Sequence, residues 1–155
     1  MSQSNVALLE SGSYKYIIGA RIKNKSNEVK TWILSQQKKD GEFSETTKGL
    51  ARLIVGYSDN RARKDRYNRE KGVKRLEKAY KSGNITKENI NKRGYNKFLD
   101  ISDNVKIVIN QDKINQDQQW DGLKGYLTNT GLPAKEVFEQ YNGLWSIERA
   151  FRITK

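Results

Sequence analysis

The residues Tyr141 to Lys155, YNGLWSIERAFRITK, place a glutamate in the middle of an otherwise apolar helical face. On a helix that advances about 100° per residue, the residues within roughly 60° of Glu148 are Val137, Tyr141, Leu144, Phe151 and Lys155. Glu148 is therefore predicted to point at the core. Burial of an unpaired carboxylate is costly, so we expect Glu148 to be paired, hydrogen-bonded or bound to a metal.

The rest of the chain alternates segments typical of helices and strands. Pro133 suits the first position of the last helix. Helical patterns also start near Val6, Ser26, Arg61 and Thr86, and a helical turn is expected within 110–119. Apolar, β-branched and aromatic runs predict strands at 14–20, 51–57, 105–109 and 123–128. This mixture predicts an α/β (α+β) fold.

The composition excludes several kinds of chemistry and favours one kind of partner. The 155 residues contain no cysteine and no histidine, which excludes disulfides, Cys-His or Ser-His-Asp nucleophiles and thiolate or imidazole zinc sites. The net charge of +12 indicates a polyanionic partner, nucleic acid before a membrane surface, with solubility as the alternative. The chain lacks the pattern of a secretory signal and any membrane-spanning run, so we expect a cytoplasmic protein.

The charge is concentrated between Arg61 and Lys81. Ten of these residues are Lys or Arg and three are acidic. Apolar positions align only in the second half of the segment, so its first half is expected to be solvated or to contact an anion. We predict that this segment contacts phosphates, and a purely solvated helix is the alternative. The candidate residues are Arg61, Arg63, Lys64 and Arg66.

The C-terminal residues resemble the Tyr-Arg-Glu-Lys signature of bacterial insertion-sequence transposases of the DDE class. The signature has Tyr, two residues, Arg, three residues, Glu, six residues and Lys; the matching positions are Tyr141, Leu144, Glu148 and Lys155, with leucine in place of arginine. The segment Trp120 to Thr130, WDGLKGYLTNT, is similar to the block that leads into this helix in the family. The segment Tyr14 to Asn24, YKYIIGARIKN, is similar to the strand that leaves the catalytic core before an insertion.

The resemblance implies a fold and a metal site. It implies an RNase H-like core in which three carboxylates bind two divalent ions, usually Mg²⁺, which activate water and then a DNA 3′-hydroxyl. Glu148 would be the third carboxylate, and the DNA-contacting residues nearby would be Tyr141, Arg149, Arg152 and Lys155. Arg152 could partly replace the missing arginine. Without the resemblance, Glu148 is more often an ion-pair partner of Arg149 or Arg152.

The resemblance also implies a truncated enzyme. It divides the chain into a core helix and strand at 1–20, a basic insertion at 21–130 and the glutamate helix at 131–155. The two catalytic aspartates of the family precede the part that this chain resembles, and one carboxylate cannot hold two metal ions. We therefore expect that the chain alone neither cleaves nor joins DNA. Asp112, Asp117 and Asp121 are weak candidates to substitute for the missing aspartates.

Three functional hypotheses follow. The chain is a piece of a DDE transposase whose partners are DNA and either the missing transposase segments or further copies of itself. Alternatively, it is a non-enzymatic nucleic-acid-binding protein that uses the basic segment on phosphates and stacks bases on Tyr67, Tyr80 or Tyr95. The third alternative is a translated remnant without function. No membrane partner is expected.

Overall fold

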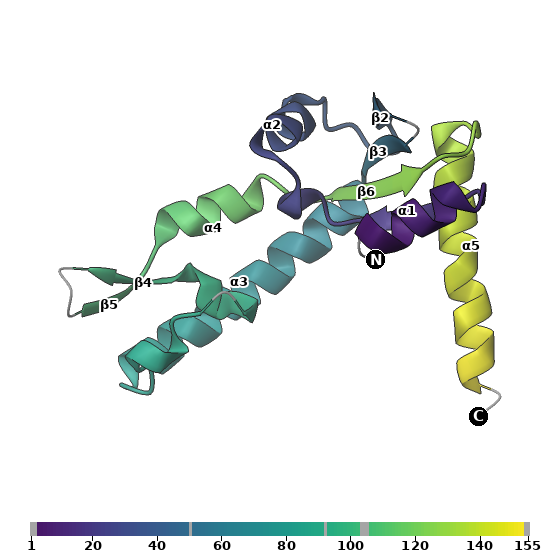
Figure 1. Cartoon of the computed structure of the whole chain (residues 1–155). Helices are drawn as coiled ribbons and strands as arrows, with labels where there is room; N and C mark the ends of the chain where they lie inside the picture. The colour runs from purple at the N-terminus through teal and green to yellow at the C-terminus, as the bar shows by residue number, and fades with distance from the viewer. Residues whose placement is uncertain (1–2, 50, 92, 103–105, 154–155) are drawn as a thin grey trace. The chain divides into compact units, whose positions relative to one another are not determined.

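The structure, a computed structural model, has an α+β fold, as the sequence predicts. It describes residues 3–49, 51–91, 93–102 and 106–153, and the side chains of 3, 48 and 145–153 lie outside this description. The chain forms two compact units (Figure 1). Unit 1 contains Met1–Ser58 and Leu123–Lys155, and unit 2 is Asp59–Gly122. Unit 2 is thus inserted into the sequence of unit 1.

Unit 1 is built on a four-stranded sheet with the strand order β1-β6-β3-β2, in which every neighbouring pair is antiparallel. Its strands are β1 (Ile17–Ala20), β2 (Phe43–Lys48), β3 (Ala51–Tyr57) and β6 (Leu123–Thr128). Residues 53–56 of β3 are all buried, without the alternation of a strand that has one face in solvent. In the register of the central pair, Ile54 lies opposite Tyr126.

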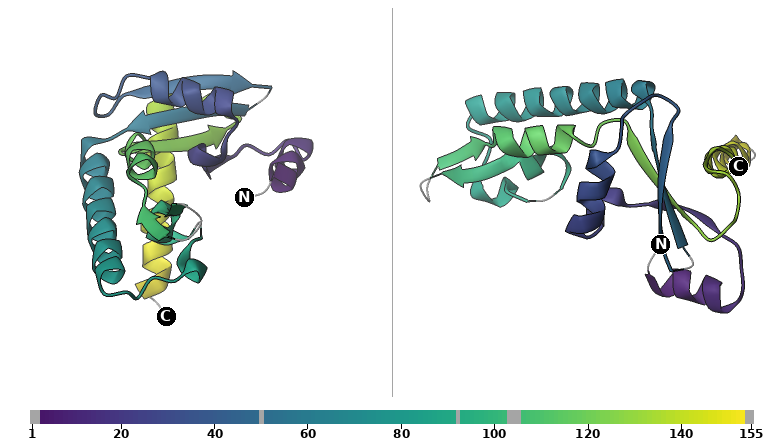
Figure 2. Two further views of the ribbon diagram at one scale, coloured as in Figure 1. Left: turned by 90° about the vertical axis from the view of Figure 1, so that its left-hand side faces the viewer. Right: turned by 90° about the horizontal axis from the view of Figure 1, so that it is seen from above.

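Helix α5 (Ala134–Ile153) covers one face of this sheet. Ile54, Tyr126 and Val137 are fully buried at the contact. Tyr126 packs edge-on against two rings of α5, with centroid distances of 5.9 Å to Phe138 and 5.1 Å to Tyr141. Figure 2 shows α5, in yellow, crossing the strands. The other helical segments of unit 1 are α1 (Gln3–Ser11), η1 (Ile22–Asn24) and α2 (Asn27–Ser35).

Two polar side chains tie distant segments of unit 1 together. The Arg52 guanidinium donates to the carbonyls of Thr130 and Leu132, both at 3.0 Å, and thereby holds the loop that leads into α5. The Asn129 side chain accepts from the Tyr16 amide at 2.9 Å and donates to the Tyr14 carbonyl at 2.9 Å. The Arg52 and Asn129 side chains thus provide hydrogen-bond partners for backbone groups that lie next to the paired strands.

Tyr16, just before β1, is buried, and its hydroxyl donates to Glu10 Oε1 at 2.7 Å. Burial, the hydrogen bond to Glu10 and the charge of Glu10 raise the pKa of Tyr16 to about 12. The unfolded phenol has a pKa of about 10, so above pH ~10 the unfolded chain releases this proton more readily than the native protein. The contribution of Tyr16 to stability is therefore complete below pH ~10 and is lost as the pH rises to about 12.

We predict that Tyr16→Phe lowers the free energy of unfolding by about 1 kcal/mol at pH 7, through loss of the hydrogen bond. The difference between wild type and variant should vanish and then change sign as the pH rises from 10 to 12, because only the wild type carries this phenol and a rise in its pKa from about 10 to about 12 outweighs about 1 kcal/mol. Urea unfolding at a series of pH values measures both curves. Curves that stay parallel over this range would contradict the assignment.

Unit 2 contains helix α3 (Asp59–Lys81), two 3-10 turns, a β-hairpin and helix α4 (Gln111–Gln118). The turns are η2 (Lys87–Asn89) and η3 (Gly94–Phe98), and the hairpin pairs β4 (Leu99–Ser102) with β5 (Lys106–Ile109). Its core consists of Leu76, Phe98, Leu99 and Ile114, against which these partly buried apolar residues pack: Val73, Ile85, Ile90, Tyr95, Ile107 and Ile109. This core is small and separate from that of unit 1, which is consistent with an independent insert.

The structure differs from the sequence-based expectations in three respects. We placed the insertion at 21–130, whereas β2, β3 and β6 pair in one sheet with β1, and the separate unit is Asp59–Gly122. Strands β2 and β4 were not predicted. Leu144, expected on the core face of α5, is 55% exposed, because the described contacts of α5 with the sheet come from Ala134 to Tyr141.

Candidate nucleic-acid interface

Helix α3 is the element that presents most of the charge. Its sequence is rich in Lys, Arg and Glu, which favour helix. Asp59 in the first turn and Lys78 and Lys81 in the last turn complement the helix dipole. The helix ends at Lys81, Gly83 follows with a φ of +71° that suits glycine, and the Asn84 amide donates to the Ala79 carbonyl there.

One face of α3 packs on unit 2. The buried residues of the helix are Arg69, Gly72 and Leu76, which lie within about 60° of one another on the helical wheel. Gly72 is required by a close approach, because a Cβ there would lie 2.4 Å from ring atoms of Tyr95. This face fixes the rotation of the helix about its own axis.

A buried ion pair anchors the same face. The Arg69 guanidinium makes two hydrogen bonds to the Asp121 carboxylate, at 2.5 and 2.7 Å, and only 6% of its side chain is exposed. The hydrogen bond to Asp121 raises the pKa of Arg69 against the opposing effect of burial, so the arginine stays charged. Beside the pair, the Gly122 amide donates to Asp65 at 3.2 Å. The first half of α3 is thereby joined to the residues that end unit 2.

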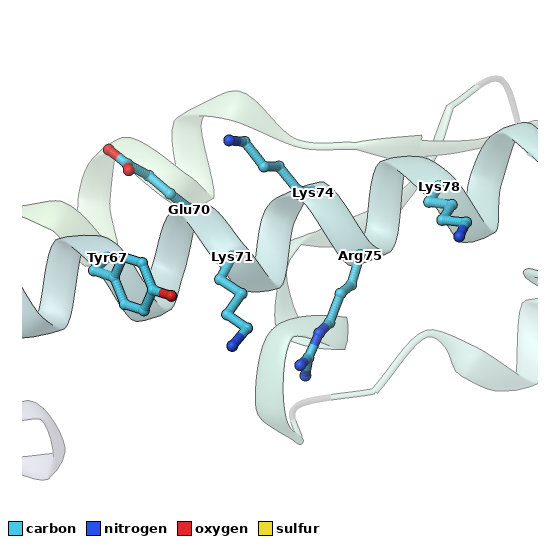
Figure 3. Close-up of a pocket in the computed structure, with 6 residues that line it drawn as sticks. All are labelled: Tyr67, Glu70, Lys71, Lys74, Arg75 and Lys78. Atoms are coloured by element: carbon cyan, nitrogen blue, oxygen red, sulfur yellow. The ribbon is translucent and has the colours of Figure 1, made fainter.

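The opposite face of α3 carries a row of cations that only Tyr67 and Glu70 interrupt within the described helix. Within about 60° of Tyr67 on the helical wheel lie exposed cationic residues that we call the basic stripe: Arg63, Lys64, Lys71, Lys74, Lys78 and Lys81. Glu70 is the one acidic residue in this sector of the described helix. Figure 3 shows the middle of the stripe around a pocket, where Glu70 and Lys74 lean to one side of the helix and Lys71 and Arg75 to the other.

The spacing within the stripe is unfavourable for an isolated helix. Lys74 and Lys78 are four residues apart, and Lys74 and Lys78 each lie three residues from a further lysine of the stripe, Lys71 and Lys81, so like charges are neighbours on the surface. Each such pair destabilises a helix by about 0.2 to 0.5 kcal/mol. A merely solvated helix gains more from alternating signs, whereas a polyanion along the stripe would turn this repulsion into attraction.

The cations singled out from sequence do not share one environment. Arg63 and Lys64 belong to the stripe, and Arg63 also donates to the side chain of Asn60. Arg61 lies off the stripe, with its Nε 3.6 Å from the Asp65 carboxylate. Arg66 faces α4, where it lines a groove with Gln111, Ile114 and Gln118. The prediction that these four residues contact phosphates stays untested.

Sequence reasoning missed the other half of the stripe: Lys71, Lys74, Lys78 and Lys81. The missing information was the rotation of the helix about its axis, which follows from the burial of Arg69, Gly72 and Leu76. A helical wheel centred on Leu76 would have indicated it, because the stripe lies diametrically opposite this leucine.

The three candidate stacking tyrosines also differ. Tyr95 packs on Gly72, and its ring centroid lies 6.3 Å from that of Phe98, so its ring belongs to the core of unit 2. Tyr80 is 39% exposed and lies on the packing side of α3. Tyr67 is 61% exposed and lies in the centre of the stripe.

The residues implied by the transposase resemblance lie in unit 1. Tyr141 is half-buried, its ring stacked edge-on against Tyr126 and 4.7 Å from Lys124 Nζ. The side chains of Glu148, Arg149 and Arg152, and the whole of Lys155, lie outside the described residues. The roles of these residues as metal ligand or DNA contacts therefore stay predictions.

The described carboxylates do not form a metal site. In the part of the chain that the structure describes, no three carboxylates come together in a way that could hold an ion such as Mg²⁺. Asp121 is bound by Arg69, Asp117 accepts from Lys97 Nζ at 2.7 Å, and Asp112 lies exposed in the first turn of α4. These three aspartates therefore do not converge on a site with one another.

Comparison with known proteins does not indicate a function for this chain. No protein-family model matches the chain, and searches of curated proteins and of solved structures return no significant match. Among the described residues, every helix is too short or too polar to cross a bilayer.

Proposed function

We propose that this protein binds nucleic acid through the basic stripe of α3, by contacts to phosphates that do not depend on base sequence. The observation that carries the proposal is the row of six exposed cations on the face opposite the buried residues Arg69, Gly72 and Leu76. From Arg63 to Lys81 this row extends about 27 Å along the helix axis. A rigid row of this length can contact several phosphates of one polyanion at once.

We propose DNA as the nucleic acid, because the resemblance in sequence is to enzymes that act on DNA. A transposase piece and a non-enzymatic DNA-binding protein both require this binding. Strand cleavage or joining would in addition require carboxylates that the described residues do not bring together. The proposal for this chain is therefore binding, and the ancestral role of Glu148 stays a prediction.

The prediction is that changing Lys71, Lys74 and Lys78 together to glutamine weakens duplex binding and its dependence on salt. Each lost phosphate contact removes about 0.9 from the slope of log K against log salt concentration. The slope should therefore become shallower by about 2 to 3. Fluorescence anisotropy with a labelled duplex at a series of KCl concentrations measures it.

The matched control removes the same charge from unit 2 away from the stripe. Lys87, Arg93 and Lys106 are exposed and lie outside α3, and their change to glutamine should leave the slope within about 0.5 of wild type. Equal slopes for the two triple variants would show that net charge, and not the stripe, controls binding. Binding to phosphatidylserine vesicles with none to the duplex would overturn the proposal in favour of a membrane surface.

A further inference from the structure

An exposed aromatic ring lies in the middle of the basic stripe. Tyr67 is 61% exposed, although its neighbours on the surface are almost all cations. Arg63 and Lys64 lie about one turn before it, Glu70 and Lys71 about one turn after it, and Lys74 about two turns after it. Lys71 Nζ lies over one face of this ring, 5.8 Å from its centroid (Figure 3).

We propose that the stripe binds a single-stranded segment of nucleic acid, with one base stacked on the ring of Tyr67. The inference rests on the proposed function, because the phosphates on either side of the stacked base would be held by the cations of the stripe. It deepens that function by naming the class of ligand: an unpaired strand in preference to a duplex.

The chemistry of the two ligands supports this assignment. In a duplex the base faces are covered by their neighbours, so a protein meets phosphates, sugars and the edges of bases. In a single strand the bases can separate and stack on aromatic side chains, while a positively charged surface follows the backbone. The stripe offers both parts, an accessible ring and cations on each side of it along one line.

The arrangement of the other tyrosines of unit 2 adds to the argument. Tyr95 serves the core by packing on Gly72, and Tyr80 lies on the side of α3 that faces unit 2. Tyr67 has no such packing role, since the core of unit 2 lies on the opposite side of the helix. A lysine at position 67 would continue the row of charges equally well for phosphate contact alone, so the tyrosine indicates a ligand with flat faces.

The test compares a labelled twenty-nucleotide dT strand with a duplex of the same length, at one salt concentration, by fluorescence anisotropy. Wild type should bind the single strand more tightly than the duplex. Tyr67→Leu should weaken single-strand binding roughly tenfold, which corresponds to loss of one base–aromatic stack. Duplex binding should change by less than about twofold, and Tyr67→Phe should retain the single-strand affinity, because stacking requires the ring and not the hydroxyl.

The control variant is Tyr80→Leu, which removes a second exposed tyrosine from the same helix and should leave both affinities unchanged. A poly(rU) strand of equal length forms a further arm. Equal binding of dT and rU strands would assign the contact to bases and phosphates shared by DNA and RNA. Tighter binding of the dT or of the rU strand would indicate whether the natural ligand is single-stranded DNA or RNA.

The outcomes separate the two proposals. If single strand and duplex bind equally and Tyr67→Leu changes neither, or weakens both alike, stacking is overturned while the stripe remains a phosphate-binding surface. If neither ligand binds to wild type at low salt, the proposed function itself fails. Circular dichroism of each variant checks that α3 is intact, which is expected because both tyrosines that are replaced are exposed.

Discussion

Replacing Arg69 by methionine is expected to destabilise unit 2 by about 3 kcal/mol, because it leaves the Asp121 carboxylate without its partner in a largely buried site. The two hydrogen bonds of this pair join the first half of α3 to the end of unit 2, where Asp121 is 14% exposed. Native-state hydrogen exchange of the α3 and α4 amides measures the effect on unit 2 separately from unit 1.

Two further variants test the mechanism of this loss. The double change Arg69→Met with Asp121→Leu removes both charges together and should recover most of the stability. Arg61→Met removes a half-exposed arginine whose Nε lies 3.6 Å from Asp65, and it should cost less than about 0.5 kcal/mol. Similar losses for Arg61→Met and Arg69→Met would mean that burial of the Arg69 pair has no energetic consequence.

Gly72→Ala is expected to destabilise unit 2 by about 1 to 2 kcal/mol, although alanine is the better helix former by about 1 kcal/mol. The added Cβ would lie 2.4 Å from atoms at the base of the Tyr95 ring, which cannot move away without displacing Phe98 and the core beside it. Overpacking of this kind typically costs about 1 to 3 kcal/mol.

The matched control is Gly143→Ala in α5. Gly143 is exposed and nothing lies within 4 Å of a Cβ there, so this substitution should stabilise its helix by up to about 1 kcal/mol. Hydrogen exchange should therefore report opposite signs for the two glycines. Stabilisation by both substitutions would contradict the packing of Tyr95 on Gly72.

The elements with strong local patterns were predictable from sequence. β3 is the apolar run Ala51–Tyr57, and α5 follows Pro133 as expected. β2 was missed because its sequence, FSETTK, is polar apart from one residue; it is an edge strand, where polar residues are common. β4 was missed because four residues containing an aspartate carry little strand signal.

The presence of a basic helix was predictable from the sequence, but the face of the helix that carries the exposed cations was not predicted. The charge of α3 is evident from the sequence, whereas the face on which it acts depends on long-range contacts. Arg69 is surrounded by residues of similar type in the sequence, and only its pairing with Asp121, 52 residues away, makes it a buried residue. Composition does not distinguish Arg69 from Arg66, whereas a helical wheel centred on Leu76 places Arg69 about 20° and Arg66 about 80° from this leucine.

Unit 2 is inserted between β3 and β6, two strands that pair with each other. Tyr57, the last residue of β3, lies opposite Leu123, the first residue of β6, in one antiparallel ladder. β3 and β6 are thus the two arms of a single hairpin whose turn has been replaced by a whole folded module. Asp65 and Arg69, near the start of unit 2, bind Gly122 and Asp121 at its end, so contacts within unit 2 hold its own two ends together. We therefore expect that a short turn could replace unit 2 without altering the register of β3 and β6.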